Sequence, residues 1–323
     1  TTKTYSYSDN GNRSTLGGAE TYDVQDRLVS NSEWNYTYNK NGYLSRKDHV
    51  TNGSWITYTY DALGNLLVVQ YSNGTKVDYL VDGSDRRVRR RLNNSFNAAY
   101  IYRDSLRPVA QLNSNGTIKS IFIYGSKSNA PDLIVQGAVT YRVISDNLGS
   151  PLYVIRTSNG QIVQQLTYDI WGKVLSDTNP GFQPFGFAGG IYDSTTGLVR
   201  FGARDYDASI GRWLNKDPIR HEGGMNLYVY VGNSPINGID PDGLQTLVPP
   251  RPIPFPPRYS PQTGPYGSAI ENIGKQLKRC DELSSALDQV RDSQISYGPP
   301  HPVISNPGDI VDYGLPKIPT LFP

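Results

Sequence analysis

Two aspartates in the C-terminal half of the chain have the residue type and the spacing of a hydrolytic pair. Asp205 and Asp217 are 12 residues apart, and Gly211 lies midway between them. If this segment is a hairpin that turns at Gly211, the two side chains share one face of the ribbon, with Cβ atoms about 5 Å apart. Two carboxylates so placed share one proton, so that one activates water while the other polarises a carbonyl group. The spacing therefore permits peptide-bond hydrolysis.

The same aspartates have a structural interpretation that spacing alone leaves open. Aspartate caps turns, and Asp205, Asp207, Asp217 and Asp240 all lie near Gly or Pro. Arg204 directly precedes the first of them. In a regular strand its side chain points to the opposite face, and it reaches the pair only across a bulge or from a twisted strand end.

The elements expected to position these residues are β-strands joined by tight turns. Asn-Gly is the strongest short signal for a two-residue hairpin turn, because both residues accept positive φ. We therefore expect residues 1–244 to be all-β, a stacked or spiralling antiparallel sheet with a unit of about twenty residues. The abundance of tyrosine, 24 residues against 8 phenylalanines, suits half-exposed strands. The Asn-Gly pairs begin at Asn10, Asn41, Asn52, Asn73, Asn115, Asn159 and Asn237.

Tyr-Asp pairs recur in the same region, and their ordered set resembles the RHS, or YD-repeat, family. They begin at Tyr22, Tyr60, Tyr168, Tyr192 and Tyr206. Residues 185–244 also resemble the RHS-associated core, through "GARDYD", "GRW", "NLY", "NSP" and "DPDGL". The resemblance runs from about residue 5 to Leu244. It implies a mainly β protein whose sheet spirals as part of a hollow shell.

The resemblance also implies an activity. In toxin-bearing members of the family, the core is a self-cleaving aspartyl protease that cuts after the Leu of the Asp-Pro-x-Gly-Leu element. On this sequence the catalytic carboxylates would be Asp205 and Asp217, with Arg204 beside them. The cut would fall between Leu244 and Gln245.

The residues before Leu244 would form the turn that presents the cut site. We expect Asp240 and Asp242 to shape this turn rather than to catalyse. Pro241 fixes φ and Gly243 supplies flexibility, which together can hold the bond extended for attack.

Other chemistry is poorly supported by the composition. The single cysteine excludes an internal disulfide, and the three histidines have no partners at metal-ligand spacing, so we expect no metal and no cofactor. A net charge of +2 does not favour nucleic acid. The run "RRVRRR" at 86–91 is either a nucleic-acid patch or a repeat strand with arginines facing solvent or the shell lumen. We expect the second.

After Leu244 the composition changes abruptly, because residues 245–323 hold 15 of the 23 prolines. We expect four parts: YD repeats at 1–184, the RHS-associated core at 185–244, a proline-rich linker at 245–267, and a variable tail at 268–323. The tail should contain a helix at about 269–293, with Cys280 packed on its apolar stripe. A short effector, a truncated toxin and an inactive plug all remain open for the tail.

The expected partners follow from the family resemblance. They are upstream repeats of the same or a partner shell protein and an immunity protein for the tail. We expect the chain to be the C-terminal piece of a longer, secreted or cell-surface protein, although no signal peptide is visible. No run of eighteen apolar residues indicates a membrane span. The alternative is a non-cleaving cell-surface or wall-associated protein that binds carbohydrate or another cell.

Overall fold

The computed structural model describes residues 5–15 and 20–247, and this part of the chain is built from β-strands. No α-helix occurs among the described residues, which have three short 3-10 helices besides their strands. The predicted all-β architecture is therefore confirmed. The predicted helix at 269–293, Cys280 and most of the proline-rich segment lie outside the described residues.

One long antiparallel sheet contains sixteen strands, each hydrogen-bonded to its neighbours in sequence, from β3 to β18. Such a meander needs only short connections, which the closely spaced turn residues provide. Its strands are β3 (Thr21–Tyr22), β4 (Leu28–Ser30), β5 (Trp34–Tyr38), β6 (Leu44–His49), β7 (Trp55–Tyr60), β8 (Leu66–Tyr71), β9 (Lys76–Val81), β10 (Arg87–Leu92), β11 (Ser95–Tyr102), β12 (Pro108–Leu112), β13 (Ile118–Ile123), β14 (Leu133–Gln136), β15 (Val139–Ser145), β16 (Pro151–Arg156), β17 (Ile162–Tyr168) and β18 (Val174–Asp177).

Two smaller sheets accompany it. The first is the hairpin of β1 (Tyr5–Tyr7) and β2 (Arg13–Thr15). The second is four-stranded and antiparallel, and we call residues 185–247, which contain it, the core segment. Its elements are η1 (Phe187–Gly189), β19 (Ile191–Tyr192), β20 (Leu198–Phe201), β21 (Arg204–Asp207), β22 (Arg212–Trp213), η2 (Arg220–Gly223) and η3 (Val231–Asn233).

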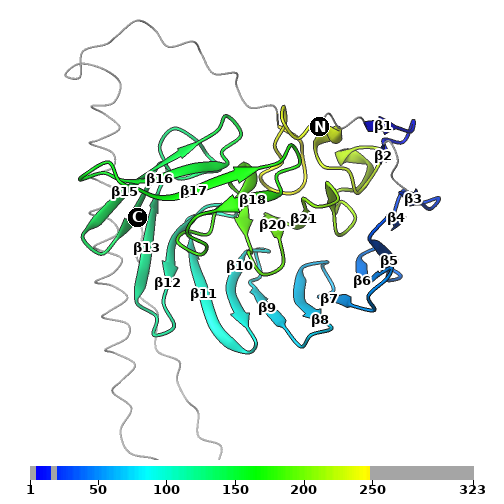
Figure 1. Cartoon of the computed structure of the whole chain (residues 1–323), viewed down its shortest axis with the longest axis horizontal. Coiled ribbons are helices and arrows are strands. Elements are labelled where there is room, and N and C mark those ends of the chain that lie inside the picture. The colour runs from blue at the N-terminus through cyan, green and yellow to red at the C-terminus, as the bar shows by residue number, and fades with distance from the viewer. Residues whose placement is uncertain (1–4, 16–19, 248–323) are drawn as a thin grey trace, which may run out of the picture. The chain divides into compact units, whose positions relative to one another are not determined.

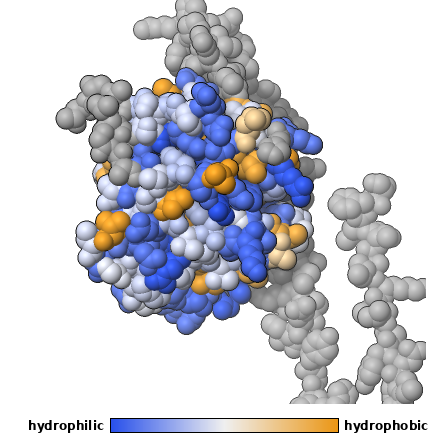
Figure 2. All heavy atoms as spheres, turned by 90° about the vertical axis from the view of Figure 1, so that its right-hand side faces the viewer, coloured by the Kyte–Doolittle hydropathy of each residue, from blue (hydrophilic) through white to orange (hydrophobic). Residues whose placement is uncertain are grey.

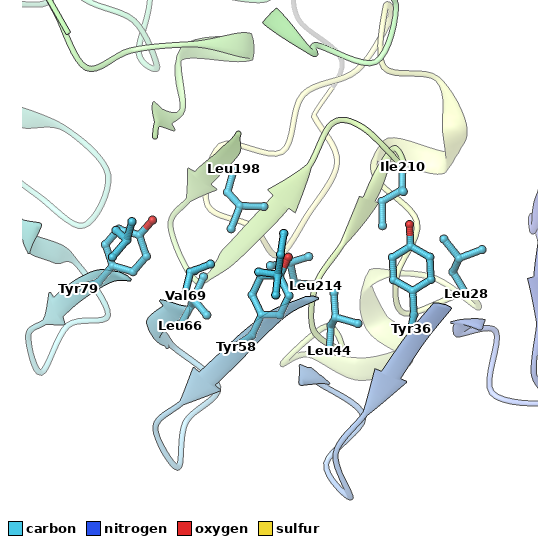
Figure 3. Close-up of a cluster of buried hydrophobic side chains, with 12 residues drawn as sticks. Leu28, Tyr36, Leu44, Tyr58, Leu66, Val69, Tyr79, Leu198, Ile210 and Leu214 are labelled. Carbon is cyan, nitrogen blue, oxygen red and sulfur yellow. The ribbon is translucent and has the colours of Figure 1, made fainter. Parts of the chain in front are cut away.

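The long sheet curves around the core segment. In Figure 1 the strands from β3 to β12 follow an arc, and β20 and β21 lie on its inner side. Figure 3 shows side chains of β4 to β9 pointing at Leu198, Ile210 and Leu214 of the core segment. Each fully buried leucine of this cluster contributes about 1.5–3 kcal/mol. Alternating apolar residues on the inner face therefore fix the core segment against the sheet.

The outer surface is mixed in character. On the face in Figure 2, hydrophobic residues are scattered among hydrophilic ones. This agrees with the alternation of buried and partly exposed residues along strands such as β7 and β9. One face of the sheet is therefore in contact with solvent, as the tyrosine-rich composition predicts.

The prediction of two-residue turns at the Asn-Gly pairs is wrong. Asn39 and Tyr43 close a longer loop between β5 and β6, and in its Asn41-Gly42 pair only Gly42 has positive φ. The side chain of Asn39 accepts hydrogen bonds from the backbone N–H groups of Asn41 and Tyr43, at 3.0 Å each. Because this side chain caps the loop, only the glycine needs the left-handed conformation.

The expectation that the arginine run faces solvent or the lumen holds for only part of it. Arg87 and Arg90 are buried, and they pair with Asp205 and Asp193 of the core segment. A register shift between Arg87 and Arg89 turns these two side chains to the same face. Arg91 is exposed. Strand β10 therefore contacts the core segment through ion pairs, whereas neighbouring strands contact it through apolar side chains.

Candidate active site

Strand β21 carries two of the predicted site residues, Arg204 and Asp205, and turns their side chains to opposite faces. All four residues of β21 are buried, and side chains of consecutive residues point to opposite faces. Arg204 therefore faces one side, where it contacts Asp217 and Asp240. Asp205 faces the other side, toward the long sheet.

Asp205 lies in an ion cluster with two arginines. Its carboxylate accepts hydrogen bonds from Arg87 Nη2 at 2.9 and 3.1 Å and from Arg200 Nη1 at 2.9 Å. Arg200 also donates to Asn65, in the loop directly before β8. All three charged side chains are almost fully buried. This cluster ties the core segment to β10 and to the loop before β8, a structural role that requires no reaction.

The predicted pairing of Asp205 with Asp217 across a hairpin is wrong. In the β21–β22 pair, Asp207 lies opposite Arg212, so the loop is centred between Ser209 and Ile210 rather than at Gly211. The backbone N–H of Leu214 donates to the Asp205 carbonyl, so the partner position of Asp205 is Leu214. The expected register required a different turn centre, and Asp217 lies beyond the end of β22.

Arg204 instead joins Asp217 to Asp240. Its Nη2 lies 2.8 Å from Asp217 Oδ2 and 3.2 Å from Asp240 Oδ2, so the two carboxylates meet at one nitrogen atom. The guanidinium group also lies over the ring of Trp213, 4.2 Å from its centroid, and its Nε donates to the Gly243 carbonyl. Two acidic side chains are thus brought together, but the second is Asp240, which we expected only to shape the turn.

The predicted cut site lies directly against Asp240. Its Oδ1 accepts hydrogen bonds from the backbone N–H groups of Leu244, at 2.9 Å, and Gln245, at 3.1 Å. The nitrogen of the Leu244–Gln245 peptide bond therefore contacts this carboxyl group. Asp242 Oδ1 accepts from the same two N–H groups, at 3.0 and 3.3 Å.

The loop that carries this bond is closed by backbone hydrogen bonds. Ile239 and Leu247 form an antiparallel bridge through bonds of 2.8 and 2.7 Å. Between them, Pro241 follows Asp240 and Gly243 has positive φ. The predicted turn is therefore present as a tight hydrogen-bonded loop, in which the N–H groups of Leu244 and Gln245 are bonded to Asp240 and Asp242.

Burial changes the acidity of both carboxyl groups. It raises the pKa of Asp240 to about 6, and the neighbouring Asp242 acts in the same direction. Burial also raises the pKa of Asp217, although the Arg204 charge opposes the change. The two acids therefore exchange protons more readily near neutral pH than ordinary aspartates do.

A cavity of about 230 Å³ opens beside these groups, and Arg204, Asp217, Asp240 and Leu244 line it. Gly223 lies at its wall. A Cβ atom at Gly223 would stand 2.4 Å from Asp217 Oδ2 and 3.2 Å from the Leu244 carbonyl oxygen. Asp217 and this carbonyl oxygen thus lie on the same side of Gly223, and the cavity has room for a water molecule.

Side chains that could bind a metal ion are not clustered in the described part of the chain. Within residues 5–15 and 20–247, no three His, Cys, Asp or Glu side chains lie close enough together to hold a metal ion. Among the same residues, no helix is long and apolar enough to cross a membrane.

Sequence reasoning missed Arg87, Arg200 and the contacts of Asp240 with Arg204 and with the predicted cut site. A usable signal existed for Arg87 and Arg90, because they follow the buried Leu66 and Val69 by one repeat unit of 21 residues. Repeat alignment would have placed both arginines on the inner face. For Asp240, no spacing rule links it to Asp217, since loops rather than paired strands bring them together.

Comparisons with known proteins agree with the fold. The family model described as teneurin YD-shell matches residues 1–236. Teneurin-1 of Gallus gallus is 32% identical over 255 residues, and teneurin-4 of Homo sapiens is 30% identical over 253 residues. These matches cover 73% and 72% of this chain, but only 9% of each teneurin.

A bacterial protein and a toxin complex also match. The tRNA3(Ser)-specific nuclease WapA of Bacillus spizizenii is 26% identical over 257 residues, which cover 74% of this chain and 11% of WapA. A crystal structure of TcdB2-TccC3-TEV superposes with a TM-score of 0.45 at 19% identity, over 75% of this chain and 17% of that one. The chain thus spans a small fraction of each protein that it resembles.

Proposed function

Because the chain belongs to the teneurin YD-shell family, we propose that it is the core-bearing part of an RHS-type shell and that it cuts its own backbone after Leu244. In this proposal Asp217 and Asp240 are the catalytic carboxyl groups and Arg204 positions them. The function is hydrolytic, acts within one chain, and separates the variable tail from the shell.

The proposed reaction needs a base near the carbonyl carbon and an acid near the leaving nitrogen. Asp217 takes a proton from a water molecule in the cavity, and the water oxygen bonds to the carbonyl carbon of Leu244. The bond from that carbon to the Gln245 nitrogen then breaks. Asp240 gives its proton to this nitrogen, which leaves as a free amine, while Leu244 gains the carboxylate.

One observation supports the proposal more than any other. Asp240 contacts the nitrogen of the predicted scissile bond, at 3.1 Å from Gln245 N, and Arg204 links it to a second buried carboxylate. A purely structural turn needs an acceptor for these N–H groups, but it does not need Asp217 or a cavity beside the bond. The raised pKa of Asp240, about 6, suits an acid that works near neutral pH.

Mass spectrometry of the purified full-length chain tests the proposal. The native sequence should yield two fragments that meet at Leu244 and Gln245, while Asp217→Asn and Asp240→Asn should slow the cut by at least about a hundredfold. Asp48→Asn, on the exposed side of β6, is the matched control and should cleave normally. An intact native chain would refute self-cleavage and favour the non-cleaving surface protein.

Asp205→Asn separates the two possible assignments of the acid pair. If the folded Asp205→Asn protein stays intact while Asp240→Asn is cut, the assignment from the family resemblance is right and ours is wrong. Circular dichroism on each variant distinguishes a folded uncut protein from an unfolded one.

The remaining parts of the proposal concern the whole shell. Among the described residues, β3 and β18 are the end strands of the long sheet, and outer edges of this kind can pair with further strands, which supports upstream repeats of the same or a partner shell protein as neighbours. We propose a secreted or cell-surface location and an immunity protein for the tail on family grounds. Co-expression of residues 245–323 with the neighbouring open reading frame tests the latter, since the tail alone should impair growth.

A further inference from the structure

The hairpin of β1 and β2 lies against the candidate active site. Figure 1 shows its two strands beside the later part of the core segment, and they form a sheet of their own rather than pairing with the long sheet. The loop between them, residues 8–12, which we call the first turn, lines the same cavity as Arg204, Asp217 and Asp240. The residues that it contributes to the cavity are Asp9, Asn10 and Gly11. The first turn therefore helps to enclose the acidic groups of the core segment.

Two asparagines of the core motifs hold the first turn. Asn226, from "NLY", donates from Nδ2 to the Asn10 carbonyl and to Asn12 Oδ1, at 2.9 Å each. Asn233, from "NSP", donates from Nδ2 to the Gly11 carbonyl at 2.9 Å. Both amide nitrogens point at the turn because the backbone carbonyls that they meet there can only accept hydrogen bonds. The proposed reaction uses neither side chain, so these contacts give the two motifs a role.

The two amides can be removed while the core segment keeps its own bonds. Asn226 Oδ1 accepts hydrogen bonds from the backbone N–H of Tyr228 and from Arg212 Nη2, at 3.1 Å each. Asn226→Asp therefore keeps both acceptor bonds and loses only the bonds to the first turn. Asn233 has a φ of 63°, in the left-handed region that glycine adopts without strain. Asn233→Gly therefore removes the amide and leaves the backbone in place.

An enclosed cavity favours the reaction because it keeps bulk water away from the acids. Burial is the largest cause of the raised pKa of Asp240 and of Asp217. If the first turn moves away, water enters the cavity, and the pKa of Asp240 falls toward its ordinary value. Asp9 moves with the turn, and the loss of its negative charge lowers the same pKa further. Asp240 then carries its proton less often near neutral pH and protonates the leaving nitrogen more slowly. The other charged or titratable groups around Asp240, which stay in place, are Arg204 of β21, Asp217, Asp242 of the same loop and Tyr230 before η3.

We propose that Asn226 and Asn233 are positioning residues that hold the first turn over the cavity, so that self-cleavage requires the hairpin of β1 and β2 to be docked on the core segment. This inference rests on the proposed function and adds a condition to it, since the cut waits until the hairpin and the core segment have folded together. Arg13, at the start of β2, holds the body of the hairpin through a 2.8 Å hydrogen bond from Nη2 to the Ile210 carbonyl. Loss of the two asparagine amides should therefore open the first turn without detaching the hairpin.

Asn226→Asp, Asn233→Gly and the double variant, each in the full-length chain, test this inference through two readouts. Hydrogen exchange followed by mass spectrometry should be faster at residues 8–12 in each variant than in the native chain. The cleavage rate at neutral pH should fall at least about threefold in each single variant and at least about tenfold in the double variant. The limb of the pH profile that follows Asp240 should move to lower pH, a change that a merely structural role of the asparagines would not produce.

Asn73→Asp and Asn94→Gly are the matched controls. Both positions are exposed turn residues of the long sheet, and Asn94 has a φ of 64°, close to that of Asn233. Both controls should be cut at the native rate with the native pH profile. Circular dichroism identifies a variant that does not fold, and the other single variant then decides.

The outcomes separate this inference from the function on which it rests. A native chain that stays intact refutes self-cleavage and the inference with it. If the native chain is cut, a native rate and an unshifted pH profile in the folded double variant overturn the inference alone. Unchanged hydrogen exchange at residues 8–12 overturns it as well, because the asparagines would then not hold the turn.

Discussion

Arg204 connects the acidic residues with the loop that they face. It contacts Asp217, Asp240 and the Gly243 carbonyl, and it stacks on Trp213. Burial lowers the pKa of this guanidinium group, and the two carboxylates oppose that effect. Because Arg204 is buried and positively charged, it holds Asp217 and Asp240 in place. It also favours a state at neutral pH in which at least one of the two carboxyl groups is ionised.

We expect self-cleavage to depend on pH through Asp240. Since its carboxyl group must carry a proton to protonate the leaving nitrogen, the rate should fall as pH rises through about 6. At low pH the rate should fall again, because Asp217 must be ionised to act as the base. Fragment yield against time, measured by mass spectrometry at a series of pH values, gives the profile. A rate that keeps rising above neutral pH would contradict the assignment of Asp240 as the acid.

Gly223 should be essential for the geometry of the site. Gly223→Ala would place a Cβ atom 2.4 Å from Asp217 Oδ2, which forces that carboxylate away from the Leu244 carbonyl oxygen. We expect cleavage to slow by at least about tenfold, with little change in thermal stability. Gly83→Ala is the matched control, because no atom lies within 4 Å of its added Cβ. Equal rates for the two variants would mean that Asp217 takes no part.

At the scale of the elements, the aspartate of the Tyr-Asp pairs is a turn residue. The Asp61 carboxylate accepts hydrogen bonds from the backbone N–H groups of Leu63 and Asn65, at 2.9 and 2.8 Å. Asp169 does the same for Trp171 and Lys173. The repeat therefore couples a tyrosine at a strand end with an acceptor that begins the next loop.

The ion cluster between β10 and β21 should dominate the contact between these two strands. Arg87→Leu leaves Asp205 buried with one arginine fewer, so we expect unfolding free energy to drop by about 3–5 kcal/mol. Arg91→Leu makes the same change at an exposed position of the same strand and should cost less than about 1 kcal/mol. Urea unfolding followed by fluorescence measures both. Similar losses in the two variants would show that the cluster contributes little.

The sequence predicts the sheet well but the site only in part. Turn residues and alternation are local, so they indicated an antiparallel all-β chain, and strand alternation correctly set Arg204 and Asp205 on opposite faces. The predicted pairing of Asp205 with Asp217 is wrong because the register of a hairpin depends on where its loop is centred. The spacing of two residues does not determine that centre. Asp240 reaches Arg204 through loop packing, which leaves no periodic signal.

At the scale of the whole described region, three hydrophobic clusters join the long sheet to the core segment. One includes Leu66 and Leu214, a second centres on Trp213 and Tyr230, and a third brings Phe122 and Phe185 together. The core segment therefore contacts both the early and the late strands of the sheet. A curved sheet that would otherwise depend on nearest neighbours gains long-range coupling from it.

We expect this region to unfold in one transition. Trp34 packs against the first cluster and Trp213 lies in the second, so the two rings report on distant strands. In the native chain, tryptophan fluorescence and far-UV circular dichroism should therefore show the same urea midpoint within error. Separate midpoints for the two probes would show that the sheet and the core segment unfold independently.

The bridge between Ile239 and Leu247 bears on whether the cut can reverse. Hydrolysis would leave a new carboxylate on Leu244 beside Asp240, Asp242 and Asp217, with Arg204 as the neighbouring cation. The four acidic groups would outnumber the two cations, Arg204 and the new amino terminus of Gln245, and only the two backbone hydrogen bonds between Ile239 and Leu247 would hold the severed ends together. Re-forming the peptide bond would require the same acidic groups to come together again, so we expect the cut to be irreversible.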